Sequence, residues 1–478
     1  MLYRVYGAKQ NANSQNALGG GDGVDTYSLE AAGFRMDGYL TGGARWDVSG
    51  DFQTMHANLG ISLTLPDTVT DNYGRENNSG QALRGRYIQP LSHGGDLQIQ
   101  AAFAHTELDM GVLLVDLRNT FDIDAQHHFK LGERHDIVWG GGYRLTTDSM
   151  PTTPLFSIRE SSRRTGSYGV FGQDEMTLTD DWRLTLGLRM DHNEFTGWEA
   201  QPDARLSWHL APNHTLWGAL SKASRSPSRG EQGSTISFIG DSTTLAPGLT
   251  VPNVLRYVSE GIPSEQLKAT QMGLRSQWAP VLSTDMVLFS HKYDHLSSFN
   301  INDIQPVPHM VGPYLDYLDI YIPYAHQGEL TLNGAEMAVD WRPSKDWNLR
   351  FSQTWQDVVS TGLLLLVDGS GSIPHQITSL HASWMPTSAM DINFWLRRTG
   401  GRPGTEPDRP TDARHAFYGI DLSATWRPQK NLELSLIGQN LNDGVCGAYA
   451  NVAGADMFPG LLPTCMPRSL SGQLRLNF

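Results

Sequence analysis

Residues 415–443 read HAFYGIDLSATWRPQKNLELSLIGQNLND and contain two runs in which apolar and polar side chains alternate. In the first run the apolar positions are Tyr418, Ile420, Leu422, Ala424 and Trp426. Successive side chains on a β-strand point to opposite faces, so this run has one apolar and one polar face. A polar turn with Pro428 follows, and Leu432, Leu434 and Leu436 repeat the alternation. The stretch predicts a hairpin whose apolar face is buried against a protein core or against lipid.

Composition narrows the choice between these two environments. The 478 residues contain no low-complexity linker, only 18% are charged, and the net charge of −14 without a Lys/Arg stripe predicts no nucleic-acid partner. No apolar run approaches the ~20 residues of a membrane-spanning helix; the longest is Leu363 to Val367. If the chain spans a membrane, it does so as a β-barrel, the other structure that satisfies every backbone group in lipid.

About twenty segments have the ~9–11 residues that a tilted transmembrane strand needs. They lie near residues 1–8, 31–40, 44–53, 80–90, 96–106, 111–124, 134–144, 167–179, 182–193, 202–210, 214–222, 267–278, 282–293, 333–342, 346–357, 374–385, 389–398, 416–427, 431–440 and 468–478. Their connections alternate between tight turns and long loops, with short exceptions near 107–110 and 194–201. Long loops at one end and turns at the other are typical of an outer-membrane barrel.

Tryptophan recurs at the turn end of these segments. The residues Trp208, Trp278, Trp341, Trp384 and Trp426 each come just before a turn proline. Indole rings favour the boundary between membrane and water, so five in register predict an aromatic girdle and not five separate plugs of a soluble core. At the chain end, Leu470, Gly472, Leu474, Leu476 and Phe478 share one face. A terminal Phe on such a strand resembles the signal read by the outer-membrane insertion machinery of Gram-negative bacteria.

Five motifs resemble the barrel of TonB-dependent outer-membrane receptors, in that family's order and along nearly the whole chain. They are GVFGQDE at 169–175 followed by WRLTLGLR at 182–189, ASRSPS at 223–228, NGAE at 333–336, GQNLND at 438–443, and Pro467-Arg468 with the terminal Phe478. Asn442 stands where Phe or Tyr is more usual in the family.

This resemblance implies an outer-membrane receptor of a Gram-negative bacterium that imports a bulky, scarce nutrient, most often a ferric siderophore. The family has a 22-strand barrel in contact with lipid, filled by a plug domain that couples to TonB. Here we expect one N-terminally truncated barrel domain over residues 1–478, with about 20 strands and no plug, so that TonB would be reached only through an absent domain. Residues 1–7 alternate like a strand, so we also expect no secretory signal peptide. A non-functional fragment and a plug-less passive pore remain as alternatives.

The loop at 294–332 is the candidate ligand site. It holds His309, Tyr314, Tyr317, Tyr321 and Tyr324 among prolines. Such rigid rings stack on a planar chelate, although they would also serve to pack the loop onto its neighbours or to extend the girdle. Cys446 and Cys465 lie in the last long loop and favour a disulfide over a metal site, because they are too far apart for a CxxC unit.

We predict no enzyme, because no GxSxG or comparable nucleophile motif of a hydrolase is present. We also expect no cofactor and no metal. Asp421 and Glu433 are interpreted as solvated lumenal partners of arginines such as Arg427, and His127-His128 as an interface or lumen pair near a turn. A porin would not explain the receptor motifs, and a propeller would show repeats of constant period.

Overall fold

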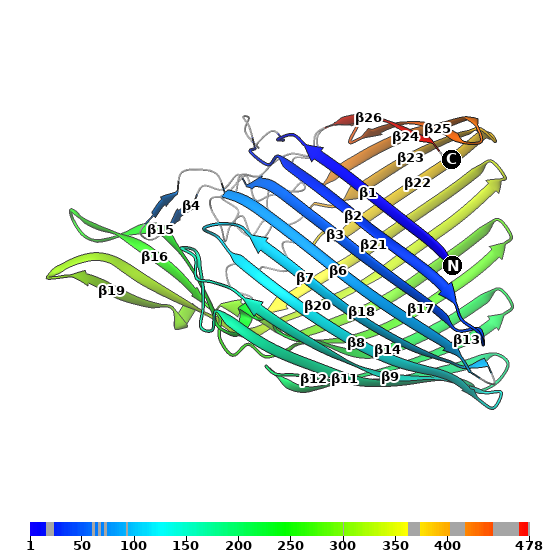
Figure 1. Cartoon of the computed structure of the whole chain (residues 1–478), viewed down its shortest axis with the longest axis horizontal. Coiled ribbons are helices and arrows are strands. Elements are labelled where there is room, and N and C mark those ends of the chain that lie inside the picture. Colours follow the sequence, from blue (N-terminus) through cyan, green and yellow to red (C-terminus); the bar gives the residue numbers. More distant parts are fainter. Residues whose placement is uncertain are drawn as a thin grey trace.

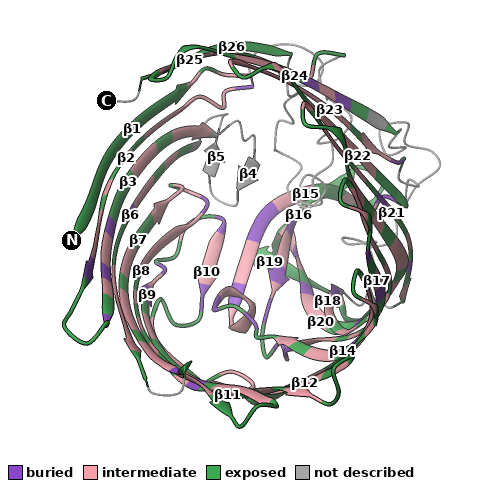
Figure 2. Ribbon diagram, turned by 90° about the vertical axis from the view of Figure 1, so that its right-hand side faces the viewer, coloured by how far each residue is buried: buried purple, intermediate pink, exposed green. Residues whose placement is uncertain are grey.

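The computed structural model describes residues 1–15, 23–59, 63–65, 68–70, 74–91, 94–299, 301–361, 373–401, 416–442 and 468–476. Most of them form one large, curved β-sheet, which Figure 2 shows end-on as a ring. In the described part of the chain, no helix is long and apolar enough to cross a membrane. The predicted all-β fold is confirmed.

The wall follows the chain order, with neighbouring strands antiparallel. Its strands are β1 (Leu2–Ala12), β2 (Tyr27–Tyr39), β3 (Arg45–Leu59), β6 (Gly74–Pro90), β7 (Asp96–Asp109), β8 (Val115–Leu131), β9 (His135–Ser149), β11 (Ser162–Thr177), β12 (Trp182–Asn193), β13 (Gly197–Ala211), β14 (His214–Arg225), β17 (Glu265–Ala279), β18 (Leu282–Phe299), β20 (Tyr314–Ser344), β21 (Trp347–Thr361), β22 (Gln376–Thr387), β23 (Met390–Thr399), β24 (Phe417–Gln429), β25 (Leu432–Gln439) and β26 (Ser469–Leu476). Each predicted segment overlaps one of these strands.

The remaining strands lie in the long connections, where none was predicted. They are β4 (Leu63–Leu65), β5 (Thr68–Thr70), β10 (Phe156–Ile158), β15 (Ser234–Ala246), β16 (Leu249–Val258) and β19 (Gln305–Val311). Several wall strands are also longer than predicted; β20 has 31 residues and runs far beyond the rim. Figure 1 shows the long connections at one end of the wall and the tight turns at the other.

Register confirms which side chains share a face. Across β24 and β25, Ala424 lies opposite Leu436 and Thr425 opposite Ser435, so apolar and polar rows separate. The polar face points into the barrel, because Asp148 on this face of β9 pairs with Arg229, and the strands that follow Arg229 lie within the ring (Figure 2). The apolar face therefore points outward.

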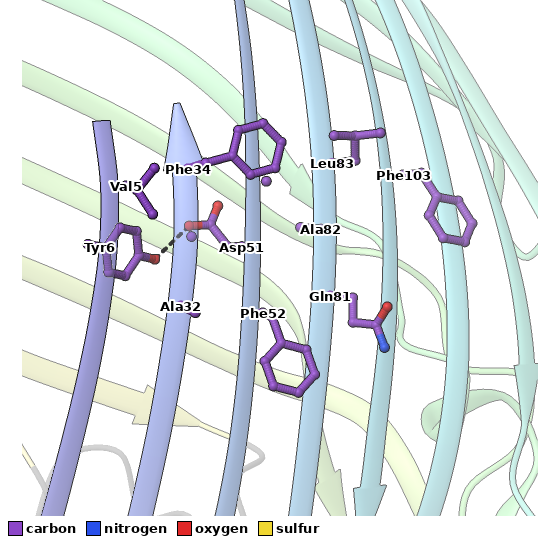
Figure 3. A pocket seen from close by; sticks show the side chains of 12 residues that line it. Val5, Tyr6, Ala32, Phe34, Asp51, Phe52, Gln81, Ala82, Leu83 and Phe103 are labelled. Carbon is purple, nitrogen blue, oxygen red and sulfur yellow. Dashed lines mark hydrogen bonds between the residues drawn. The ribbon is translucent and has the colours of Figure 1, made fainter. Parts of the chain in front are cut away.

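Figure 3 shows the wall over β1 to β7, at a hollow of about 480 Å³ lined in part by Phe34, Phe52 and Phe103. The Tyr6 hydroxyl reaches across β2 and donates a hydrogen bond to Asp51 (2.7 Å). The residue between them in the register is Gly33, where a Cβ atom would come within 2.5 Å of the Tyr6 ring. The glycine is what allows this contact across a strand.

The molecule is hollow. Its accessible surface is 27803 Å², whereas a compact folded monomer of 52.9 kDa exposes about 18,000 Å². Among the described residues the one cluster of buried apolar side chains lies in the long connections: Leu113, Leu155, Phe238, Tyr257 and Ile322. The wall thus exposes both of its faces, and the long connections contain the only core in the part of the chain that is described.

Candidate ligand-binding site

A small sheet stands at the loop end of the barrel, and we call it the mouth sheet. It consists of β15, β16, β19 and the first part of β20, residues 314–324, with the short strand β10 paired to β15. Strands β16 and β20 pair in parallel, with Val254 opposite Asp319, while the other pairings are antiparallel. The sheet projects past the rim in Figure 1 and lies inside the ring outline in Figure 2. It therefore stands where a solute enters the lumen.

One face of the mouth sheet is apolar and holds it in place. Phe238 and Tyr257 stack with ring centroids 5.7 Å apart, and Phe238 is only 3% exposed. Leu113 and Leu155, from the connections that follow β7 and β9, complete the cluster. Since burying such side chains is the dominant favourable term in folding, the apolar face fixes the sheet against the wall connections.

The opposite face carries polar and aromatic side chains together with Val254 and Val307. His309 on β19 stacks on Tyr317 of β20, with ring centroids 4.2 Å apart and planes 10° from parallel. The Arg256 guanidinium donates to Asp319 (2.5 Å) and to the Ser237 hydroxyl (3.2 Å). Tyr321 shares this face, opposite Gln305. Flat rings and guanidinium donors on one surface match the needs of a planar, polar ligand.

The five predicted ligand residues do not form one surface. His309, Tyr317 and Tyr321 lie together on the polar face, as just described. Tyr324 packs against the apolar cluster instead, and Tyr314 is 76% exposed at the tip of the β19–β20 hairpin. The reason is the two-residue period of β20, which places Leu318, Ile320, Ile322 and Tyr324 on one face and Tyr317, Asp319 and Tyr321 on the other. The sequence analysis did not identify Arg256 and Asp319, which share the polar face.

Ion pairs join the segment between β14 and β15 to the wall, and one of them is buried. Arg229 is paired with Asp148 of β9 (3.4 Å), and both side chains are almost fully buried. Arg225 bridges Glu231 and Glu265, each at 2.7 Å. Burial raises the pKa of Glu231, but hydrogen bonds from Arg225 and Ser228 outweigh it and the pKa lies below the ordinary value. Glu231 therefore stays ionised, and the base of the mouth sheet is fixed at neutral pH.

The lumen face below the mouth sheet is lined with ion pairs between neighbouring strands. They include Arg144–Asp122, Arg275–Asp285, Arg350–Asp340 and Arg397–Asp421. Glu433 pairs with Arg427 (3.0 Å), as predicted. Asp421 also pairs with a lumenal arginine, Arg397, which lies diagonally across from it on β23, opposite Gly419. It is only 8% exposed, so the prediction that it is solvated is wrong. The lumen is a polar, mostly charge-compensated passage.

The two adjacent histidines separate to opposite faces. His128 faces the lumen between Asp136 (2.5 Å) and Asp96 (3.4 Å), while His127 accepts a hydrogen bond from the Trp139 indole (3.2 Å) on the outside. No group of three or more metal-ligating side chains gathers in the described ranges.

The five tryptophans of the predicted girdle all lie at the turn end and are partly exposed. Trp208 stacks on Trp182 (5.0 Å), and Trp384 stacks on Trp347 (5.5 Å). Trp278 donates a hydrogen bond to the Thr284 hydroxyl (2.8 Å). Trp341 and Trp426 are 45% and 50% exposed. Cys446, Cys465 and Phe478 fall outside the described residues.

Comparisons with known proteins show which family and which solved structures this architecture is similar to. The family "TonB dependent receptor-like, beta-barrel" matches residues 2–441, and no curated protein matches the sequence. Similar solved structures include a variant of the ferric enterobactin receptor PfeA from Pseudomonas aeruginosa (14% identity, TM-score 0.77, covering 100% of this chain and 75% of that one). Two others are the siderophore receptor PirA from Acinetobacter baumannii (13%, 0.76, 100% and 75%) and the ferric-catecholate import receptor Fiu from E. coli K12 (11%, 0.72, 100% and 77%).

These structures support the fold, and the family match covers nearly the whole chain. The antiparallel wall strands in chain order, the outward apolar face and the polar lumen match the architecture of an outer-membrane barrel. This chain therefore belongs to the TonB-dependent receptor family, whose β-barrel it forms.

Proposed function

We propose that this chain is the wall and ligand-capturing mouth of an outer-membrane receptor for a ferric siderophore. The observation that carries the proposal is the polar face of the mouth sheet, where the His309–Tyr317 stack lies beside Arg256 at the entrance to a polar lumen. The similar structures support the same substrate class, because their names describe receptors for ferric enterobactin and other siderophores. Uptake would be energised through TonB by way of a plug domain, as the family resemblance implies.

The chemistry of the site suits a chelate better than a small ion. A ferric chelate presents flat aromatic or hydroxamate groups, and the exposed ring of His309 offers a surface on which to stack. Arg256 has five N–H donors, of which Asp319 and Ser237 occupy only part. Because Asp319 compensates its charge, Arg256 orients a ligand by hydrogen bonds more than by net attraction.

The test is binding of a ferric catecholate siderophore to the full chain folded in detergent micelles. Binding is measured by the quenching of tryptophan fluorescence. The double substitution His309→Ala and Tyr317→Ala removes the stack, and we expect about 10-fold weaker binding, since each ring contact contributes about 0.5–1.5 kcal/mol. Tyr314→Ala, at the exposed tip of the same hairpin, is the control and should bind normally.

Two results would count against this function. Unchanged binding in the double variant would remove the mouth sheet from ligand capture. Absence of siderophore binding by the unaltered chain, together with a steady ionic current through planar bilayers, would favour the passive pore.

A further inference from the structure

Three lysines form one row on the outer face of the wall. Lys222 of β14 lies directly opposite Lys268 of β17, which in turn lies opposite Lys292 of β18. They share their face with Leu220 and Met272, which are 61% and 51% exposed on the outside. Like charges directly opposite one another destabilise a sheet. Such a row is therefore a place where an anion is favoured.

The protein supplies only part of the required negative charge. Asp294 lies 3.0 Å from the Lys268 ammonium and 3.5 Å from that of Lys292, and Glu329 lies 3.8 Å from Lys292. Lys222 forms no ion pair or hydrogen bond with any described residue. Two carboxylates thus face three ammonium groups, and the uncompensated charge is at the Lys222 end of the row.

An apolar hollow of about 480 Å³ lies directly below that end. It begins at the next cross-strand pair, Leu220 opposite Thr270, and extends toward the turns. Its lining includes Leu206, Leu216 and Met272, and Gly218 lies among them with no atom closer than 3.8 Å to the place of a Cβ. Positive charge at the top of an apolar groove is complementary to a molecule with an anionic head and a hydrocarbon tail.

We propose that the lysine row binds the phosphate of an outer-leaflet lipid headgroup, with an acyl chain in the hollow below. The inference rests on the membrane location that the proposed function assumes, but not on the imported ligand. A lipid is favoured over free phosphate because the hollow continues the site into the apolar face, where a free anion gains nothing. Basic residues next to a membrane surface attract anionic headgroups in this way.

The probe is diphosphoryl lipid A, added to the full chain folded in detergent micelles, with retained lipid measured by native mass spectrometry. Lys222→Gln disturbs no ion pair, and we expect about fivefold weaker retention, while the triple substitution Lys222→Gln, Lys268→Gln and Lys292→Gln should weaken it about 100-fold. Lys9→Gln is the matched control, because Lys9 already pairs one to one with Glu30 (2.7 Å). That variant should retain the lipid as the unaltered chain does.

Two further measurements distinguish a lipid phosphate from free phosphate. Lipid A without its phosphates should bind like the triple variant, and 10 mM inorganic phosphate should leave diphosphoryl lipid A in place. Unchanged retention in both lysine variants, or full displacement by inorganic phosphate, would overturn the proposal. If the triple variant does not fold, retention by Lys222→Gln alone decides. A chain that binds no siderophore but retains lipid A would refute the proposed function and leave this inference intact.

Discussion

Charged side chains on the two faces of the wall differ in how fully they are paired. Lumenal carboxylates are paired across strands: Asp47, only 4% exposed, accepts from Arg84 (3.1 Å) and Arg86 (2.7 Å). The outward row that begins at Lys222 is instead left partly uncompensated. A buried unpaired charge is costly, which accounts for the pairing of Asp47. At the lysine row, the proposed lipid phosphate would supply the missing counter-charge.

Glu231 gives a prediction at this scale. Its folded-state pKa lies below the ordinary value of about 4.3 because Arg225 and Ser228 donate to the carboxylate. The stabilisation is therefore fully present above the unfolded-state pKa and is lost as pH falls through the folded-state pKa. We expect amide exchange around residues 228–232 to increase only as the pH falls below the ordinary glutamate pKa and through the lower folded-state pKa of Glu231. Glu231→Gln should remove this acid step, and a step that persists in that variant would contradict the assignment.

Hairpins could be predicted from the sequence where the alternation of side chains and the turn lie in one continuous stretch. The β24–β25 hairpin has the expected faces, and in β26 Leu470 and Leu474 share one side, because a two-residue period fixes the face of every side chain. The turn before β3 is also readable, since Gly42 and Gly43 adopt φ of 89° and 81°.

The mouth sheet could not be predicted in the same way. Its parallel β16–β20 pairing joins Val254 to Asp319, and local alternation carries no information about which distant strands meet. One signal was available: in YLDIYIPY, residues 317–324, apolar residues at 318, 320 and 322 alternate with Tyr317, Asp319 and Tyr321. Read with a two-residue period, it would have placed Tyr324 on the apolar side.

Phe238 tests whether the mouth sheet is a separately stabilised element. Its ring is 3% exposed at the centre of the apolar cluster, so Phe238→Ala should destabilise this sheet by about 3–5 kcal/mol. Because the cluster lies outside the wall, hydrogen exchange should accelerate in β15 and β16 and stay unchanged in β24. Leu245→Ala, on the same strand but 48% exposed, is the control. Uniform acceleration across the wall would contradict this separation.

At the scale of the whole molecule, the outer face of the wall is largely apolar, which suits contact with hydrocarbon. Exposed apolar side chains cover the wall from Phe34 on β2 to Leu474 on β26, a far larger patch than soluble monomers expose. Among the described residues β1 pairs only with β2 and β26 only with β25, so these two strands are the edges of the ring. Contact of the outer face with acyl chains is the physical basis of every functional inference above.

Spin labels at Leu422, Ser423, Ala424 and Thr425 of the chain folded in lipid bilayers test that contact directly, with Cys446 and Cys465 replaced by Ser. Dissolved oxygen concentrates in the membrane and a nickel chelate stays in water. Oxygen should increase the spin relaxation rate of the labels at 422 and 424, and the nickel chelate that of the labels at 423 and 425. The reason is that the register places the first pair outward and the second in the lumen. Equal accessibility of all four sites to nickel would contradict a lipid-facing wall.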